Sequence, residues 1–360
     1  MKIDTYTYGL GDNSVLIVNR AIVEGIRNAG HLRTDHTPAL MQHGIDWDGV
    51  GRMPDEVEPG ADIAVCQASI SLEVMKKIRE ISPETLIVVQ RDSSHCNWWK
   101  KLVEAEQKKY GIFWDVYGGG LLERENAEYE LADKITVLSK WVQSTFETEG
   151  LNDKVVHVGP QTFDHEKWPL RPMQRKWDDK KDKFRVLFAG QTGLRKGMFY
   201  LLDAWKNLML PNAELLIAGL PENPSKELAR EINKRVDETP NVIAMNYVPL
   251  NSMADLYAKC HVLCIPSIEE GSTMTGIEAM SVGRPVIATF SAGIDILRHL
   301  ENGVEIESGS WEAIVDAIGF YHSNYDAWTQ HAVEASRSVE ECSIEKFGER
   351  YVKRLEEMVR

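Results

Sequence analysis

The feature that most constrains this chain is an alternation of short apolar runs with longer stretches of helical periodicity. In the N-terminal half, the runs KIDTYTYGL, ADIAVCQAS, ETLIVVQ and DKITVL are each followed by such a stretch. Parallel strands need a long crossover connection, which is usually a helix, so repeated strand-helix steps indicate a parallel sheet with helices on both faces. The N-terminal half therefore predicts an α/β fold.

The same alternation begins again after a polar, charged stretch, HEKWPLRPMQRKWDDKKDK. A chain of 360 residues is also too long for one compact core. We therefore predict two Rossmann-like domains, at 1–168 and 184–340, joined by a linker at 169–183 and followed by a C-terminal helix at 341–360 that packs back on the first domain. Open sheets of this kind bind ligands at the carboxyl ends of their strands, here expected to face each other across a cleft.

Composition narrows the class of partner and the compartment. The formal net charge of -14 gives no overall attraction for nucleic acid or an anionic membrane, although a local basic patch remains compatible with it. The chain holds 5 cysteines without CxxC pairs or zinc-like spacing, which favours reduced, buried thiols. We find no signal peptide and no apolar run long enough to span a bilayer, so we expect a cytoplasmic protein. The oligomeric state is not indicated.

One short stretch, PSIEEGSTMTGIEAMSVGRPVIA, points to a binding site. It begins where the buried strand HVLCIPS ends, passes through a glycine turn and enters a short helix. The backbone N–H groups of Met274, Thr275 and Gly276 are expected to converge at the start of that helix. Unpaired donors and a partial positive charge at a helix N-terminus suit a phosphate group.

Two carboxylates flank this turn. Glu270 directly precedes the Gly-Ser-Thr run, and Glu278 follows eight residues later on the helix. Both could accept hydrogen bonds from the hydroxyls of a ligand. The alternative is that Glu278 only interacts favourably with the helix N-terminus and that Glu270 is a solvated loop residue.

The order of residues in this stretch closely resembles the donor site of the retaining GT-B glycosyltransferases of the family 4 type, the glycosyl transferases group 1. That pattern has a Pro-Ser strand end, Glu-Gly, a glutamate eight residues on, Ala-Met, and a Gly-x-Pro-Val strand, and all are present here. Upstream, VLFAGQTGLRKGMFYLLDAW is similar to the Gly-Arg-x-x-x-x-Lys-Gly segment of the family. The resemblance covers 184–305, and the N-terminal half matches more weakly.

The resemblance implies a nucleotide-sugar donor held by the C-terminal domain, in a GT-B architecture. It assigns Glu278 to the ribose hydroxyls, Glu270 to the sugar hydroxyls, and the amides near Thr275 to the distal phosphate. Lys196 is expected to neutralise the diphosphate, and Val248 to lie in the segment that contacts the base. A lysine and a helix N-terminus can stabilise the charge that develops on the leaving diphosphate, so we expect neither a metal nor a cofactor.

In the N-terminal half we single out four residues. His95 is expected either to contact the donor sugar near the reacting centre or to be an ordinary hydrogen-bonded histidine. Gly11, in a glycine turn, would allow close backbone approach to the donor diphosphate or the acceptor. Trp98 and Trp99, on an amphipathic helix with four lysines, are either core residues or an acceptor surface for a sugar, a lipid head group or nucleic acid.

The chain also departs from the family pattern. Gln191 stands where an arginine is usual and brings no positive charge to the phosphates, so Arg195 is the candidate substitute. The Asn-Gly-x-Asp that usually ends the first domain is replaced by QTFD, from Gln161. A DWD triplet at Asp46 imitates a metal-binding motif, but no buried strand leads into it, and we interpret it as a loop.

These observations predict a retaining, metal-independent glycosyltransferase with catalytic residues Lys196, Arg195, Glu270 and His95. Its substrates would be a nucleotide sugar and an acceptor hydroxyl on a glycan, a glycolipid, a small molecule or a hydroxymethylated DNA base. Alternatives on the same fold are a nucleotide-sugar epimerase, a phosphorylase, or a nucleotide-sugar-binding protein without catalysis, the last suggested by Gln191.

Overall fold

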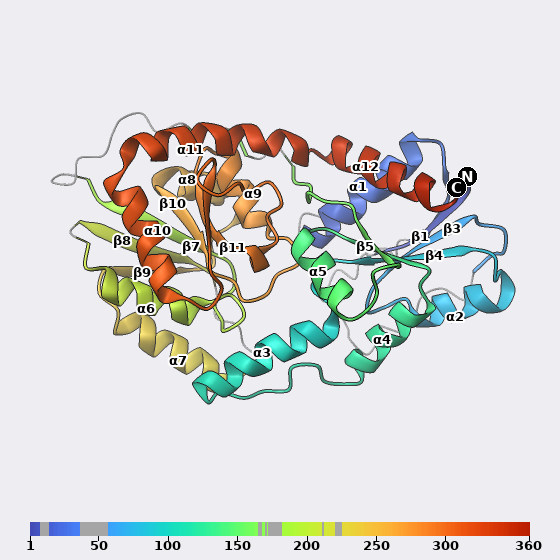
Figure 1. Cartoon of the computed structure of the whole chain (residues 1–360), viewed down its shortest axis with the longest axis horizontal. Coiled ribbons are helices and arrows are strands. Elements are labelled where there is room, and N and C mark those ends of the chain that lie inside the picture. Colours follow the sequence, from blue (N-terminus) through green and yellow to red (C-terminus); the bar gives the residue numbers. More distant parts are fainter. Residues whose placement is uncertain are drawn as a thin grey trace. The chain divides into compact units, whose positions relative to one another are not determined.

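The structure is a computed structural model, shown in Figure 1, in which the chain divides into two compact units. The described residues are 1–7, 14–36, 57–164, 168–169, 171, 182–210, 212–219 and 225–360. Unit 1 comprises Met1–Trp99, Tyr117–Phe163 and Cys342–Arg360, and unit 2 comprises Lys100–Val116 and Asp164–Glu341.

Unit 1 is built on a 6-stranded parallel sheet with the order β2-β1-β3-β4-β5-β6. Its strands are β1 (Ile3–Tyr6), β2 (Leu32–Asp35), β3 (Ile63–Gln67), β4 (Leu86–Arg91), β5 (Lys134–Val137) and β6 (Val155–His157). Its helices are α1 (Ser14–Asn28), α2 (Leu72–Ile81), the start of α3 (Cys96–Tyr110), α4 (Leu121–Leu131), α5 (Lys140–Thr148) and α12 (Ile344–Met358).

Helices cover both faces of the unit 1 sheet, as the alternating side chains of β3 require. Ile63 and Val65 belong to the core shared with α1 and α12, and Ala64 and Cys66 belong to the core on the opposite face. Helices α1 and α12 lie side by side (Figure 1). They cross at two glycines, since a Cβ atom on Gly25 would lie 2.7 Å from the Cα of Gly348.

Unit 2 is built on a second 6-stranded parallel sheet with the order β12-β11-β10-β7-β8-β9. Its strands are β7 (Phe184–Ala189), β8 (Ala213–Ala218), β9 (Val242–Asn246), β10 (Val262–Ile265), β11 (Val286–Thr289) and β12 (Gly303–Ile306). Its helices are α6 (Met198–Leu208), α7 (Lys226–Asp237), α8 (Leu250–Lys259), α9 (Met274–Ser281), α10 (Trp311–Ser323) and α11 (Tyr325–Ser338), with short 3-10 turns at Phe290–Ala292 and Val339–Cys342. The strand order reverses between β7 and β10.

One segment groups differently from the domain boundaries expected from the sequence. The segment Lys100–Val116 groups with unit 2. The physical reason is packing, because Ile112 is buried in the unit 2 core and Tyr110 and Trp114 pack against it. The C-terminal helix α12 groups with unit 1. Most of the expected linker, 169–183, lies outside the described residues.

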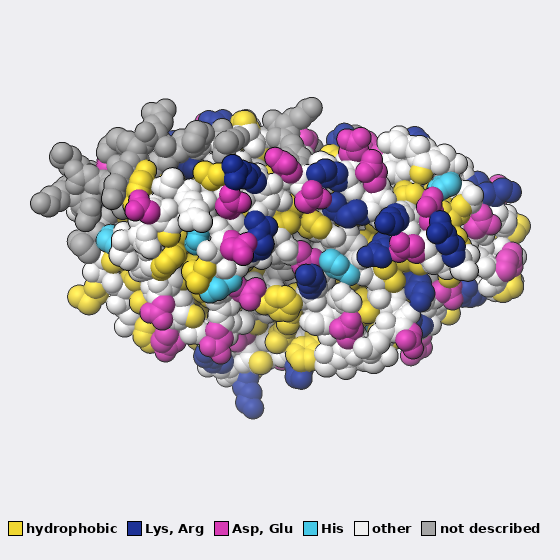
Figure 2. Space-filling view, turned by 45° about the horizontal axis from the view of Figure 1, so that its top comes forward, with side chains coloured by type: hydrophobic (Ala, Val, Ile, Leu, Met, Phe, Trp, Pro, Cys, Tyr) yellow, Lys and Arg dark blue, Asp and Glu magenta, His cyan; other side chains and the backbone are white. Residues whose placement is uncertain are grey.

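The structure bears on the expectations about cysteines, membrane-spanning helices and surface charge. All 5 cysteines are buried and free, as expected of small apolar side chains. Within the described ranges, no helix is both long and apolar enough to cross a bilayer. On the face shown in Figure 2, acidic and basic side chains are interspersed.

Candidate functional site

The candidate site lies at the point in the unit 2 sheet where the strand order reverses. Strands β7 and β10 are neighbours, with Val186 beside Val262, but the chain leaves them toward opposite edges of the sheet. Diverging connections at such a point open a crevice outside the carboxyl ends of the strands. The two loops that begin there contain the residues predicted from the sequence, Lys196 after β7 and Glu270 after β10.

A glycine brings these two loops together. Gly197 starts α6 with a left-handed φ of 71°, and a Cβ atom there would lie 1.9 Å from the carbonyl oxygen of Pro266. Only glycine combines that backbone conformation with such a close approach. The contact fixes the position of Lys196, the preceding residue, against the loop that follows β10.

Four charged side chains meet in this loop pair. The ammonium group of Lys196 donates to Oε1 of Glu270, which also accepts from the hydroxyl of Ser267 at 3.2 Å. Nη1 of Arg195 lies 3.1 Å from Oε2 of Glu269 and 3.5 Å from Oε2 of Glu270. The predicted catalytic residues Lys196, Arg195 and Glu270 are thus brought together, with Glu269 as a fourth member.

Burial and pairing act in opposite directions on these charges. Burial lowers the pKa of Lys196, although the neighbouring Glu270 partly opposes this. Burial alone would raise the pKa of Glu270, but Lys196 and Arg195 hold it below its usual range. The Lys196 and Glu270 side chains keep 17% and 11% of their surface exposed, so a ligand can reach both.

Helix α9 begins at Met274, four residues after Glu270. Thr273 is the N-cap residue, and its side chain accepts no capping hydrogen bond. Among the described residues, no group accepts a hydrogen bond from the backbone N–H of Met274, Thr275 or Gly276. First-turn amides that lack partners and stand at the positive end of the helix can bind an anion such as a phosphate.

The second glutamate lies farther along α9 and is buried. Glu278 is 6% exposed, and its Oε2 accepts a hydrogen bond of 2.9 Å from the hydroxyl of Tyr257 on α8. Burial raises the pKa of Glu278 to about 7, and the Tyr257 hydrogen bond opposes this rise. Its carboxyl group can therefore change protonation state near neutral pH. Sequence reasoning missed Tyr257, because no local pattern relates two residues on different helices.

The other predicted donor-binding residues are placed less specifically. Gln191 is exposed just after β7, and Val248 is half-buried after β9. Arg195, the candidate substitute for a phosphate-binding arginine, also donates to the carbonyl oxygen of Glu269 at 3.0 Å. Gly11 and the triplet at Asp46 lie outside the described residues.

His95 lies in unit 1 and has a structural environment. It is 2% exposed, its Nδ1 accepts from the backbone N–H of Asn97 at 3.2 Å, and its ring packs on Tyr129 and Phe146. Burial lowers the pKa of His95 to about 4, so the imidazole is neutral at physiological pH. These contacts are compatible with a hydrogen-bonded histidine that caps the start of α3, and a role near the donor sugar stays a prediction.

Trp98 and Trp99 follow on the same helix and are half-buried. The ring of Trp99 packs edge-on against Tyr117, with ring centroids 5.1 Å apart. This contact accounts for part of the buried surface of Trp99, and an acceptor role for the two tryptophans stays a prediction.

The carboxyl ends of β3 and β4 in unit 1 hold a second polar cluster, which sequence reasoning also missed. Arg91 donates to Oε1 of Glu125 at 2.8 Å, and Tyr117 donates to Oε2 of the same carboxylate at 3.0 Å. The hydroxyl of Ser69 donates to Glu125 as well, and Glu128 accepts from the backbone N–H of Ser69 at 2.6 Å. These residues come from four separate segments of the chain, so no spacing in the sequence predicts the cluster.

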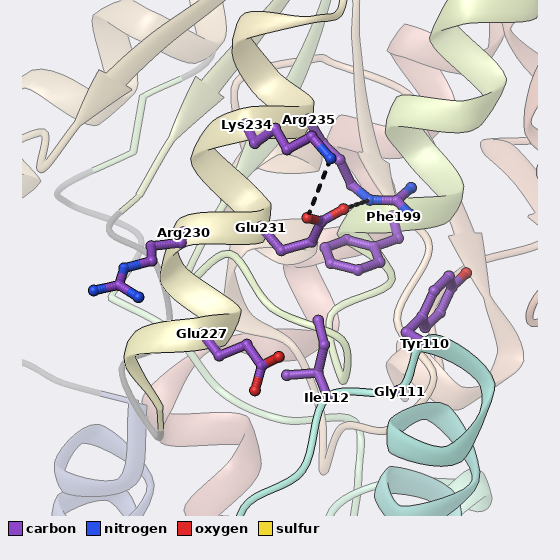
Figure 3. A pocket seen from close by; sticks show the side chains of 9 residues that line it. All are labelled: Tyr110, Gly111, Ile112, Phe199, Glu227, Arg230, Glu231, Lys234 and Arg235. Atoms are coloured by element: carbon purple, nitrogen blue, oxygen red, sulfur yellow. Dashed lines mark hydrogen bonds and ion pairs between the residues drawn. The ribbon is translucent and has the colours of Figure 1, made fainter.

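A cavity of about 570 Å³ lies elsewhere in unit 2, between α7 and the end of α3 (Figure 3). Three of its charged side chains, Glu231, Lys234 and Arg235, pair with one another. The guanidinium of Arg235 lies 4.2 Å from the ring centre of Phe199 and donates to Glu231 at 2.9 Å. We interpret this cavity as the solvated face of α7. In the described parts of both units, no group of three or more His, Cys, Asp and Glu side chains is placed to hold a metal ion.

The chain resembles known glycosyltransferases in sequence. Residues 183–324 match the family of glycosyl transferases group 1. An uncharacterized glycosyltransferase of Haemophilus influenzae is 25% identical over 295 residues, which cover 79% of each chain. The lipopolysaccharide 1,2-N-acetylglucosaminetransferase of Salmonella typhimurium is 28% identical over 209 residues, which cover 54% of this chain and 50% of that enzyme.

The fold has a close structural counterpart. The crystal structure of Anabaena HepE in complex with UDP-glucose matches with a TM-score of 0.70 at 15% identity, covering 99% of this chain and 100% of HepE. This likeness confirms the predicted architecture of two Rossmann-like domains.

Proposed function

We propose that this chain, a group 1 glycosyltransferase with the GT-B fold, transfers a sugar from a nucleoside-diphosphate donor to an acceptor hydroxyl, with retention of anomeric configuration and without a metal ion. The observation that carries the proposal is the Lys196–Glu270 pair at the β7–β10 switch point, with the N-terminus of α9 four residues after Glu270. A site with one ammonium group, unpaired amides and accessible carboxylates matches the phosphates and hydroxyls of a nucleotide sugar.

Each residue has a distinct role in this proposal. The amides of Met274, Thr275 and Gly276 bind the distal phosphate, and Lys196 neutralises the diphosphate. Glu270 accepts hydrogen bonds from the sugar hydroxyls. Glu278 accepts them from the ribose, and the loop at Val248 contacts the base.

The chemistry follows from where charge develops. When the bond between the anomeric carbon and the diphosphate oxygen breaks, its electron pair remains on the departing diphosphate. Lys196 and the α9 amides stabilise that negative charge, and they are already oriented before the reaction. The acceptor oxygen forms the new bond from the same face, and the departing phosphate takes its proton. We assign no protein nucleophile.

The donor is proposed to be a UDP-sugar, since HepE was crystallised with UDP-glucose. The acceptor is proposed to be a hydroxyl on a saccharide. The name of the Salmonella relative, a lipopolysaccharide N-acetylglucosaminetransferase, supports that class. A cytoplasmic location remains part of the proposal.

Two measurements test the proposal. Thermal melting with UDP-, GDP- and ADP-sugars should show selective stabilisation by the donor, because a ligand at 100 times its Kd adds about 2.7 kcal/mol. Nucleoside diphosphate should then be released only when a saccharide acceptor is added, and EDTA should leave that rate unchanged. Isomerisation of the donor without an acceptor would indicate an epimerase, and binding without turnover a nucleotide-sugar-binding protein.

A further inference from the structure

The hydrogen bond between Tyr257 and Glu278 joins helices α8 and α9. Tyr257 is the last buried residue of α8 and is 1% exposed. Its hydroxyl donates a hydrogen bond of 2.9 Å to Glu278. The ring of Tyr257 packs edge-on against Trp168, with ring centroids 5.7 Å apart. Because the ring is enclosed, the hydroxyl has a fixed position from which to hold one carboxylate oxygen.

A buried arginine fixes the two helices against each other. Arg284 is 2% exposed and donates to the carbonyl oxygens of Tyr257 at 3.2 Å and Ala258 at 2.9 Å, near the end of α8. It also donates to those of Val282 at 3.2 Å and Gly283 at 2.9 Å, just after α9. A cation suits carbonyl groups at helix C-termini. The distance between Tyr257 and Glu278 is therefore set by a clamp at the base of both helices.

The hydrogen bond from Tyr257 leaves the other carboxylate oxygen of Glu278 available to accept from a ligand. Among the described residues, Oε2 accepts from Tyr257, and no hydrogen bond to Oε1 is present. A carboxylate accepts at both oxygens, whereas its protonated form has one O–H donor and a reduced acceptor capacity. Glu278 can thus bind a pair of ligand hydroxyls only while it is ionised and correctly turned.

We propose that Tyr257 is a positioning residue for the donor site, whose hydroxyl orients the Glu278 carboxylate so that it can accept hydrogen bonds from the ribose hydroxyls. The proposal rests on the donor-binding role proposed for Glu278. It makes donor affinity depend on a side chain that does not itself contact the donor.

The surroundings of Glu278 make Tyr257 its main polar neighbour. Helix α9 packs against α8, α11, β10 and β11. On α8, Asp255 and Lys259 are exposed. On β10, burial raises the pKa of Cys264, which keeps that thiol neutral. The four residues of β11 include no titratable side chain.

Helix α11 contributes one buried titratable side chain, His331. Its Nδ1 lies 2.9 Å from the hydroxyl of Tyr321, and burial lowers its pKa, so it is neutral near pH 7. The other charged side chains of α11 are exposed or paired with each other: Asp326 is exposed, and Glu334 pairs with Arg337. The titration of Glu278 is accordingly governed by its burial and by Tyr257.

The test is calorimetric binding of UDP-glucose, without acceptor, between pH 6 and pH 8.5. In the wild type, Kd should fall as the pH rises through about 7, because Glu278 becomes ionised. Tyr257→Phe keeps the ring against Trp168 and removes only the hydroxyl. We expect about five- to ten-fold weaker binding at pH 7, with the rise in affinity displaced to higher pH.

Two comparisons separate positioning from general damage. In a Glu278→Gln background, Tyr257→Phe should cause no further loss, and the ratio of the two Kd values should not change with pH. Tyr351→Phe removes a buried hydroxyl contact of similar length, 3.1 Å to Thr136 in unit 1, and should leave the pH profile of Kd unchanged. If Tyr257→Phe does not fold, Trp168→Phe tests the same link through the ring that seats Tyr257, and should displace the pH profile in the same direction.

The outcomes distinguish the two proposals. If the wild type binds UDP-glucose but Tyr257→Phe binds it equally well at every pH, Tyr257 has no positioning role. The same conclusion follows if the loss persists in the Glu278→Gln background. If neither UDP-glucose nor any other nucleotide sugar binds the wild type, the proposed donor site itself is wrong.

Discussion

The carboxyl ends of the two parallel sheets both carry buried charges, but the charges are arranged differently. In unit 1, the Arg91 and Glu125 side chains are 8% and 2% exposed, and Glu125 also accepts from Tyr117 and Ser69. In unit 2, Lys196 and Glu270 remain partly exposed, beside α9 amides that have no acceptor among the described residues. One cluster satisfies itself, and the other keeps capacity for a ligand.

A structural cluster and a binding site can be distinguished by whether their polar groups are all paired within the protein. A fully satisfied polar network stabilises and rigidifies the segments that it joins. A site for a charged ligand instead keeps donors and acceptors that the fold leaves unpaired. We therefore expect substitutions in unit 1 to change stability and substitutions in unit 2 to change turnover.

The largest expected effect is on stability, in unit 1. Glu125→Ala leaves the guanidinium of Arg91 buried without its carboxylate, which should cost about 3–5 kcal/mol of unfolding free energy. Turnover measured well below the melting temperature should stay within about three-fold of the wild type. Chemical denaturation and steady-state kinetics measure the two quantities.

Glu130→Ala on the same helix is the matched control, since Glu130 is exposed and should change stability by less than about 0.5 kcal/mol. A hundred-fold loss of turnover in Glu125→Ala, with stability intact, would contradict this distinction. It would show that the unit 1 cluster takes part in the reaction.

In unit 2, the corresponding experiment is Lys196→Ala. Removing one preorganised charge from the leaving diphosphate should lower kcat/KM by about 10²–10³-fold. Lys206→Ala, at an exposed lysine of α6, is the control and should retain wild-type kinetics. Near-normal turnover of Lys196→Ala would show that this loop pair is, like the unit 1 cluster, only structural.

A third substitution asks whether the close approach of the two loops matters. Gly197→Ala places a Cβ atom 1.9 Å from the Pro266 carbonyl oxygen and strains a left-handed residue, so we expect a loss of about 2–4 kcal/mol together with weaker donor binding. Gly319→Ala, inside α10 with open space around it, should instead stabilise by about 0.5–1 kcal/mol. Equal melting temperatures for the two variants would contradict the packing argument.

The same contrast explains what the sequence could predict. The strand-helix alternation was sufficient for two parallel sheets, and the local order of residues from Pro266 placed Glu270 and Glu278 around one helix start. Contacts between distant segments were not predictable. Arg91 and Glu125 are 34 residues apart, and Tyr257 and Glu278 are 21 apart on different helices. Such pairs depend on tertiary packing, which leaves no periodicity or spacing in the sequence.

The smallest expected effect concerns His95, where the two interpretations of the sequence still differ. If His95 acts as the N-cap of α3, His95→Asn should preserve the cap, because asparagine also accepts from the first-turn amides. The lost ring contacts with Tyr129 and Phe146 should cost about 1–2 kcal/mol, and kcat should stay within about three-fold. His95→Ala should lose the cap in addition, about 1 kcal/mol more. If His95→Asn melts like the wild type but loses turnover by a hundred-fold, His95 takes part in the reaction. Unit 1 then contributes to the chemistry through a buried residue.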